Sequence, residues 1–369
     1  MKVLILIIVL LGQTNVCSSN DDHVFMYNGG PQHTGVYTSP PLTEFHRVRW
    51  TFEGQKGISS PPLVYEGIVY FGDWANNLYA VNVQSGKAIW EIATGEGRGI
   101  GGPPTIIDSV AYWGTGNGQL YAIGAFTGKE LWKFYTEGYK RGTDASICFP
   151  PLIHDNLAYF TSHDSGIYIV DILAGSLKQR LAGKNSMCNS PSMVDSTIIY
   201  TDASGNVFAI DATACKPRWH FKAEDNIHHS PAIAEGVGYV TSWDHHVYAI
   251  DIATGEELWK FETDNKMNYD PAVYDDMVYV NTNESHLYAL DAKTGELVWE
   301  LNSGGRTYSK PAIAGDIIYF GSGDYHLYAL DVKTCEEKWK FKAESMVCHP
   351  TVYDGRVFFG SGTKVYVLE

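Results

Sequence analysis

The sequence predicts an all-β protein, an eight-bladed β-propeller with four-stranded antiparallel blades. Three observations predict it: a repeat of about forty residues, a tryptophan at one fixed position in most copies, and an N-terminal strand that completes the last copy. A repeat architecture lets a chain of 369 residues form one ring rather than two or three separate domains.

Each repeat begins with a proline followed by an apolar run, and these prolines are 39 to 47 residues apart. Proline is tolerated at the first residue of a strand. In the copy after Pro231, a turn, an alternating strand, a polar hairpin and a second strand lead to the tight turn Ala253-Thr254-Gly255 and a last strand. Four short strands per copy make one blade. The prolines are Pro61, Pro103, Pro150, Pro191, Pro231, Pro271, Pro311 and Pro350.

A tryptophan recurs in the last strand of the copies, and we expect its ring to pack against the next blade. A blade cannot bury both of its faces alone, so a large flat side chain at a fixed height suits this contact. The third copy has Gln179 at this position. The predicted blade-docking residues are Trp50, Trp90, Trp132, Trp219, Trp259, Trp299 and Trp339.

The eighth copy starts at Pro350, and the sequence reaches Glu369 before a tryptophan occurs. The segment His46–Trp50 lies 40 residues before Trp90, which is the repeat spacing. We therefore expect the N-terminal strand around Trp50 to complete the last blade. This pairing closes the ring and removes both free edges.

The repeat resembles that of the pyrroloquinoline quinone (PQQ) repeat propellers. The resemblance rests on stretches such as Tyr288 to Trp299 and on the opening segment Asn28 to Gly35, and it covers residues from about 27 to 369. One branch, the quinoprotein alcohol dehydrogenases, holds the quinone with calcium beside two adjacent cysteines, and this chain has no adjacent cysteines. The resemblance therefore implies the short, cofactor-free branch of binding platforms, which includes an outer-membrane assembly lipoprotein.

Residues 1–19 have the pattern of a signal peptide: Lys2 precedes a short apolar run, and small residues follow. We expect 20–45 to be a lead segment and 46–369 to be the propeller. The mature protein is then secreted, either extracellular or, in a bacterium, periplasmic, with no transmembrane segment. Its net charge of −15 argues against nucleic-acid binding. We expect a monomer, and Asn283 begins a glycosylation sequon.

The residues just before each proline should surround the mouth of the central channel. Several copies have reactive side chains there instead of serine or glycine, and three interpretations stay open. One is a metal site, with copper favoured by nearby methionines; its candidate ligands are His228, His229, Cys348 and His349. The second is an acid–base or nucleophilic site; its candidates are His229, Tyr269, Asp270, Tyr308 and Lys310. The third, which we favour, is a polar lining that contacts a partner.

Two further features lie near the same face. Cys148 and Cys188 come from adjacent blades at similar heights, so we expect a disulfide between them. The middle hairpins contain Trp74 and Trp243, and exposed aromatic residues there would suit contact with a protein or a sugar.

The sequence thus predicts a secreted scaffold that binds a protein or carbohydrate partner through its loop face and needs no cofactor. The alternative is an enzyme with its site at the channel mouth, either an oxidoreductase of quinoprotein type that uses PQQ with calcium, or a metal-dependent enzyme that uses copper.

Overall fold

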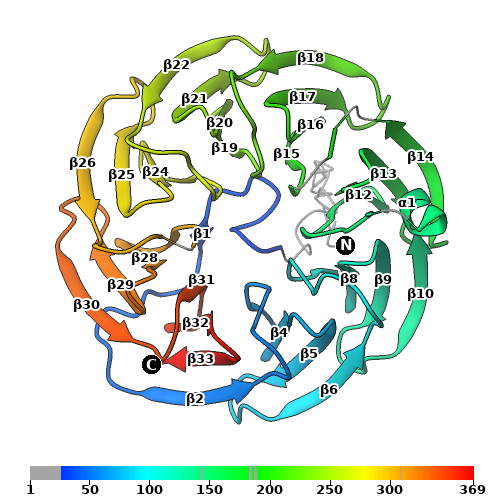
Figure 1. The fold of residues 1–369 in the computed structure, drawn as a ribbon, viewed down its shortest axis with the longest axis horizontal. Helices are drawn as coiled ribbons and strands as arrows, with labels where there is room; N and C mark the ends of the chain where they lie inside the picture. Colours follow the sequence, from blue (N-terminus) through cyan, green and yellow to red (C-terminus); the bar gives the residue numbers. More distant parts are fainter. Residues whose placement is uncertain (1–25, 143, 183–184, 187–188, 308) are drawn as a thin grey trace, which may run out of the picture.

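The computed structural model describes residues 26–142, 144–182, 185–186, 189–307 and 309–369. These ranges form eight sheets around a common axis, so the predicted eight-bladed propeller is confirmed (Figure 1). Neighbouring strands within each blade are antiparallel and follow one another in the chain, except where the last blade closes. The one helix in these ranges, α1 (Glu137–Arg141), connects the second and third blades. No helix of the described residues is long and apolar enough to cross a membrane.

The strands of the first four blades run from the axis outward in chain order. The first blade contains β3 (Leu63–Tyr65), β4 (Ile68–Gly72), β5 (Asn77–Asn82) and β6 (Ala88–Ala93). The second contains β7 (Thr105–Ile107), β8 (Val110–Gly114), β9 (Gln119–Gly124) and β10 (Glu130–Tyr135). The third contains β11 (Leu152–His154), β12 (Leu157–Ser162), β13 (Gly166–Asp171) and β14 (Ser176–Ala182). The fourth contains β15 (Ser192–Val194), β16 (Thr197–Thr201), β17 (Asn206–Asp211) and β18 (Pro217–Lys222).

The remaining blades repeat this order, and the eighth takes its outer strand from the N-terminal part of the chain. The fifth contains β19 (Ala232–Ala234), β20 (Val237–Thr241), β21 (His246–Asp251) and β22 (Glu257–Glu262). The sixth contains β23 (Ala272–Tyr274), β24 (Met277–Asn281), β25 (His286–Asp291) and β26 (Leu297–Asn302). The seventh contains β27 (Ala312–Ala314), β28 (Ile317–Gly321), β29 (His326–Asp331) and β30 (Glu337–Lys342). The eighth contains β31 (Val347–Tyr353), β32 (Arg356–Ser361), β33 (Lys364–Leu368) and β2 (Val48–Glu53).

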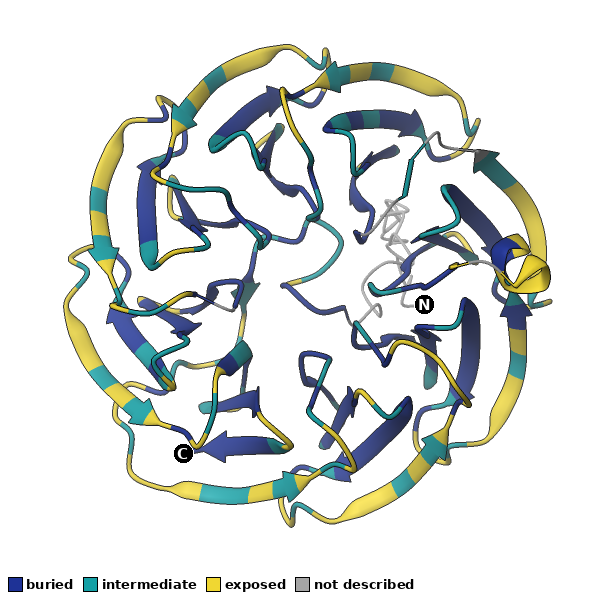
Figure 2. Ribbon diagram, viewed as in Figure 1, coloured by how far each residue is buried: buried dark blue, intermediate teal, exposed yellow. Residues whose placement is uncertain are grey.

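The inner three strands of a blade are mostly buried, and the outer strand alternates between half-buried and exposed residues (Figure 2). In β22, Trp259 and Phe261 are half-buried, whereas Lys260 between them is exposed. This period of two follows from strand geometry, because successive side chains point to opposite faces. The apolar pattern therefore places one flat core between each pair of neighbouring blades.

In seven of the eight blades, the repeated tryptophan docks its blade onto the next. Each indole Nε1 donates a hydrogen bond to a backbone carbonyl at 2.7–3.1 Å, while the ring itself is half-buried. The donor–acceptor pairs are Trp50–Val83, Trp90–Ala125, Trp132–Ile172, Trp219–Ile252, Trp259–Ala292, Trp299–Val332 and Trp339–Leu42. In the third blade, where Gln179 replaces tryptophan, the equivalent carbonyl of Ala212 accepts from the Tyr159 hydroxyl at 3.2 Å.

The N-terminal strand closes the ring. Strand β2 pairs antiparallel with β33, with Trp50 opposite Val367 and Phe52 opposite Val365. Ionic contacts extend this pairing, because the Glu369 carboxylate lies 2.5 Å from the guanidinium groups of both Arg47 and Arg49. The predicted closure by the strand around Trp50 is therefore confirmed.

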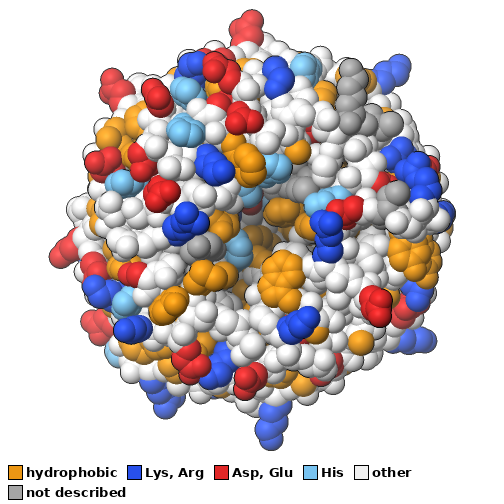
Figure 3. Space-filling view, in the orientation of Figure 1, with side chains coloured by type: hydrophobic (Ala, Val, Ile, Leu, Met, Phe, Trp, Pro, Cys, Tyr) orange, Lys and Arg blue, Asp and Glu red, His pale blue; other side chains and the backbone are white. Residues whose placement is uncertain are grey.

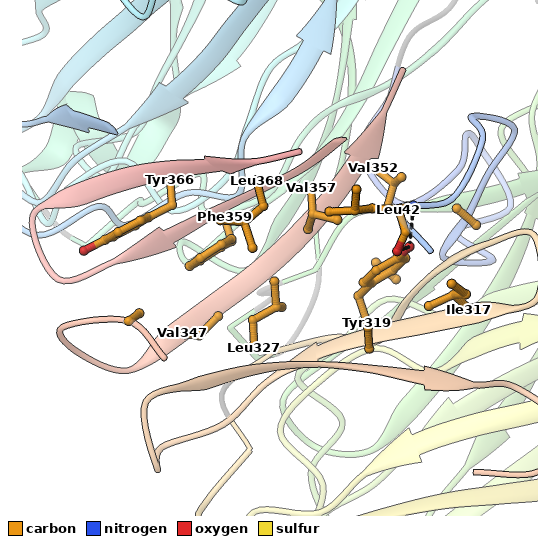
Figure 4. Packing of buried hydrophobic residues seen from close by; sticks show 14 residues of the cluster. Leu42, Ile317, Tyr319, Leu327, Val347, Val352, Val357, Phe359, Tyr366 and Leu368 are labelled. Carbon is orange, nitrogen blue, oxygen red and sulfur yellow. Dashed lines mark hydrogen bonds between the residues drawn. The ribbon is translucent and has the colours of Figure 1, made fainter. Parts of the chain in front are cut away.

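Leu42 completes the contact between the seventh and eighth blades (Figure 4). The eighth blade has no turn between its third and fourth strands, because those strands come from opposite ends of the sequence. Leu42 supplies the missing backbone groups: its carbonyl accepts from Trp339 Nε1 at 2.9 Å and from the Tyr319 hydroxyl at 3.1 Å. Its amide donates to the same hydroxyl at 2.8 Å.

The preceding residues, 28–37, lie on the axis of the ring (Figure 1). Four of their carbonyls accept hydrogen bonds of 2.8–2.9 Å from the middle residues of four consecutive inner strands. The donor–acceptor pairs are Met193–Pro31, Ile233–Gln32, Val273–Thr34 and Ile313–Gly35. The short strand β1 (Val36–Tyr37) then pairs parallel with β27. The lead segment therefore occupies the channel as an added backbone layer.

We predict that deletion of residues 1–53 abolishes monomeric folding, because it removes β2, Leu42 and the axial segment together. A chain of residues 20–369 is the control, and light scattering with thermal melting is the measurement. The control should be a monomer with one cooperative transition, whereas the shorter chain should associate or lack a transition. A monomeric short chain with an unchanged melting temperature would contradict the closure.

Candidate functional site

The loop face is the face of the ring that carries the blade-to-blade loops and the hairpins between the second and third strands of each blade. The residues before the prolines converge at its centre. The structure brings together His229, Tyr269, Asp270, Lys310 and His349 around a cavity of about 120 Å³. The space-filling view shows this hollow at the centre of the molecule, with hydrophobic and histidine side chains around it (Figure 3). The lead segment supplies part of the lining through Tyr27, Asn28 and His33.

Asp270 is the buried anion of the cavity. Its carboxylate accepts hydrogen bonds from Asn28 Nδ2 and from the Ser230 amide, each at 2.8 Å. Lys310 Nζ lies 3.5 Å away and His229 Nδ1 lies 3.8 Å away. Burial raises the pKa of Asp270, but the charge of Lys310 and the other contacts outweigh it, so the pKa is lowered and the carboxylate is ionised.

Lys310 is the buried cation. Besides its contact with Asp270, its ammonium group donates to the carbonyl of His33 at 2.9 Å. Burial lowers the pKa of Lys310 to about 8, and the charge of Asp270 opposes that shift. Because Asn28 and His33 both belong to the lead segment, the ion pair fixes that segment in the channel. Asp270 and Lys310, two of the five predicted acid–base candidates, therefore have a structural role; their catalytic role stays a hypothesis.

Three imidazoles surround the ion pair, and burial lowers the pKa of His33, His229 and His349 to about 4 each. All three are therefore neutral at physiological pH. His33 is fully buried, and the carbonyl of Pro191 approaches its ring without completing a hydrogen bond. The Tyr269 ring lies between the other two, with ring centroids 5.9 Å from His229 and 5.5 Å from His349.

The other two predicted metal ligands, His228 and Cys348, are not among the residues that line the cavity. His228 packs against Trp243, with ring centroids 4.4 Å apart. Cys348 is a thiol whose pKa burial raises to about 11, which disfavours the thiolate that binds metals. In the described part of the chain, no group of three or more His, Cys, Asp or Glu residues is arranged to hold a metal ion. Copper binding stays a hypothesis.

Two predicted residues of this region, Tyr308 and Cys188, lie outside the described residues, as does the predicted signal peptide. The disulfide between Cys148 and Cys188 is therefore untested. Asn283, the candidate glycosylation site, is half-buried in the hairpin between β24 and β25, and its modification is also untested.

Asn28 and His33 are the functional-site residues that sequence reasoning missed. Both belong to the segment Asn28 to Gly35, which the family resemblance singled out without assigning it a place. The segment has no repeat partner, so its position on the axis follows from contacts with residues more than 240 positions away.

Exposed apolar side chains occupy another part of the loop face. Trp74, in the hairpin between β4 and β5, is 55% exposed, and Gly99 lies so close to its ring that an added Cβ would be 2.5 Å from Cε3. Tyr325, Met346 and Tyr139 are also exposed, in the seventh-blade hairpin, the connection to the eighth blade and helix α1. These side chains lie over the seventh, eighth, first and second blades.

Comparison with known proteins gives one family. A family model described as outer membrane protein assembly factor BamB matches residues 76–220, 176–269, 208–339 and 244–369. No curated protein sequence matches.

Solved structures with the same fold include proteins of different kinds. BamB from Moraxella catarrhalis has a TM-score of 0.75 at 19% identity, over 88% of this chain and 99% of that chain. The computationally designed Ika8 protein has a TM-score of 0.76 at 17% identity, over 88% and 99% of the two chains. Quinohemoprotein alcohol dehydrogenase from Comamonas testosteroni has a TM-score of 0.78 at 13% identity, over 93% of this chain and 80% of that chain. At these identities the likeness shows the fold alone.

We predict that the free energy of unfolding falls as the pH is lowered from about 6.5 to 4. In this range the unfolded chain binds protons at histidines that stay neutral in the folded protein, since the pKa of His33, His229 and His349 is about 4 there. The free energy of unfolding, measured with urea at each pH, should depend less steeply on pH in His349→Gln than in the wild type. The control is His46→Gln, at an exposed position, which should leave this slope unchanged. Equal slopes for wild type and His349→Gln would contradict the burial of a neutral imidazole.

Proposed function

Because the chain belongs to the family described as outer membrane protein assembly factor BamB, we propose that it is an exported scaffold that binds a polypeptide partner on its loop face. The single observation that carries the proposal is the exposed apolar group on that face, Trp74 with Tyr325, Met346 and Tyr139. Aromatic residues and methionine are enriched where proteins dock. The signal-peptide pattern of residues 1–19 supports export.

The cradle of Trp74 supports a docking role. Its amide donates to the Gly57 carbonyl at 2.9 Å, and Gly57 and Gly99 both lie against its ring. The neighbouring glycines leave the ring held in place but open to solvent. A pre-positioned aromatic side chain loses little conformational entropy on binding, which favours its use as an anchor.

A carbohydrate is the second partner class, because aromatic rings also suit sugars. The exposed side chains of Met346 and Tyr325 on the same face favour a polypeptide, since methionine adapts to apolar protein surfaces. A monomer is proposed because all eight blades are completed within one chain.

The quinoprotein alternative fits the channel poorly. Calcium takes six to eight oxygen ligands, roughly, with several carboxylates among them. Asp270 is the one carboxylate among the described residues that line the cavity, and Asn28, Ser230 and Lys310 already engage it. The lead segment also occupies the axis where a ring-shaped cofactor would need space. We derive no chemistry through a quinone, and proteins with the same fold carry very different functions.

Photocrosslinking tests the scaffold proposal. The photoreactive residue benzoylphenylalanine is placed at position 74 or 325 of the full chain in its native cells, and at position 258 as the control. Leu258 is 52% exposed on the outer strand β22, so it matches Trp74 in exposure but lies away from the loop face. We predict discrete polypeptide adducts from 74 and 325 and none from 258.

Adducts of the same kind from all three positions, or none from 74 and 325, would contradict docking on the loop face. The absorbance spectrum and metal content of the protein purified from those cells test the alternative. Stoichiometric quinone, calcium or copper would overturn the cofactor-free scaffold.

A further inference from the structure

The third blade departs from the repeat at three positions that meet on the loop face. Cys148 stands two residues before the anchoring proline, His163 stands in the hairpin between β12 and β13, and Asp144 belongs to the long connection that follows α1. No other copy has a histidine at the hairpin position of His163. The residues there are Trp74, Gly116, Ala203, Trp243, Asn283, Gly323 and Gly362.

The side chains lie in the order of a nucleophile, a base and an orienting carboxylate. Cys148 Sγ is 3.5 Å from His163 Nε2, and His163 Nδ1 is 3.4 Å from Asp144 Oδ2. The two contacts use opposite nitrogens of one ring. This is the arrangement in which an imidazole takes a proton from a thiol while a carboxylate holds its tautomer.

Backbone contacts fix the three residues. The His163 amide donates to the Ser146 carbonyl at 3.1 Å, which ties the hairpin to the segment between Asp144 and Cys148. The Ser146 hydroxyl donates to the Gly116 carbonyl of the preceding blade at 2.7 Å. Gly101 packs directly on Cys148: an added Cβ there would lie 2.7 Å from its carbonyl oxygen. The geometry is therefore set by two blades rather than by one mobile loop.

The orienting carboxylate is ionised. Burial raises the pKa of Asp144, but hydrogen bonds from the Ser146 hydroxyl and amide and the charges of His163 and Arg98 outweigh it, so the pKa is lowered. Arg98 Nη1 lies 2.8 Å from Asp144 Oδ2. Cys148 is half-buried, so part of the residue is open to solvent.

We propose that Cys148, His163 and Asp144 form a reactive thiol site whose substrate is a disulfide bond. His163 takes the proton of Cys148, and the thiolate attacks one sulfur of the disulfide. A new bond forms between Sγ and that sulfur, the original S–S bond breaks, and the departing thiolate takes the proton from His163. No other oxidant or reductant is needed, because the disulfide of the ligand is the electron acceptor.

The contrast with Cys348 supports the assignment. It occupies the same position before its proline as Cys148, but the hairpin of its blade has Gly362 where His163 stands. Burial raises the pKa of Cys348 to about 11, and burial also raises the pKa of Cys215 and Cys335. Cys148 is thus distinguished among the described cysteines by a base beside its sulfur.

The test uses the fully reduced chain of residues 20–369 and the small disulfide dithiodipyridine. Release of thiopyridone gives the rate, and peptide mass spectrometry assigns it to each cysteine. Cys188→Ser is made in parallel, so that the predicted pairing with Cys148 cannot affect the result. Cys148 should react about tenfold faster than Cys348 at pH 7, as a thiol with an adjacent base does.

The decisive variant is His163→Gln. This substitution should slow the reaction of Cys148 with dithiodipyridine about tenfold at pH 7. It should also move the midpoint of the pH–rate profile of Cys148 upward, toward the ordinary thiol value of about 8.5. Asp144→Asn, at the positioning residue, should move the midpoint in the same direction by less. The melting temperature of each variant shows that it is folded. An unchanged rate and midpoint in folded His163→Gln would overturn the proposal, because a structural histidine would not alter them.

Discussion

A ring of blades must be closed at its edge and filled at its axis, and residues 26–53 meet both requirements in this protein. Strand β2 removes the free edge of the eighth blade, and Leu42 replaces the backbone groups that this blade lacks. The axial residues 28–37 then hydrogen-bond to four inner strands. The blades repeat locally, whereas this one stretch of the described chain contacts blades that lie far apart in the ring.

Asp270 and Lys310, the buried charged residues at the channel mouth, hydrogen-bond to that segment. A buried ion pair stabilises a fold only when its remaining hydrogen-bonding capacity is satisfied. Here each of the two residues has one hydrogen bond with the lead segment. Asp270 accepts from Asn28, and Lys310 donates to the carbonyl of His33. Both residues therefore anchor the lead segment, and the exposed apolar side chains elsewhere on the loop face are the candidates for partner contact.

The blades could be predicted because their signals repeat: a proline at each inner strand and a tryptophan at every outer strand but that of the third blade are both local packing requirements. The axial position of His33 could not be predicted from the sequence, because its neighbours lie on several blades and no periodicity points to them. The contact of Cys148 with His163 escaped for the same reason, because it needs the relative height of a loop and a hairpin. Deviations from a repeat show where to look but not which residues meet.

Hydrogen–deuterium exchange at four backbone amides tests most directly whether the lead segment holds the ring together. The amides of Met193, Ile233, Val273 and Ile313 have lead-segment carbonyls as acceptors. They should exchange only through global unfolding, as slowly as the most protected amides of the middle strands. Fast exchange at these four amides with the middle strands still protected would show that the segment does not occupy the axis, and would contradict this account.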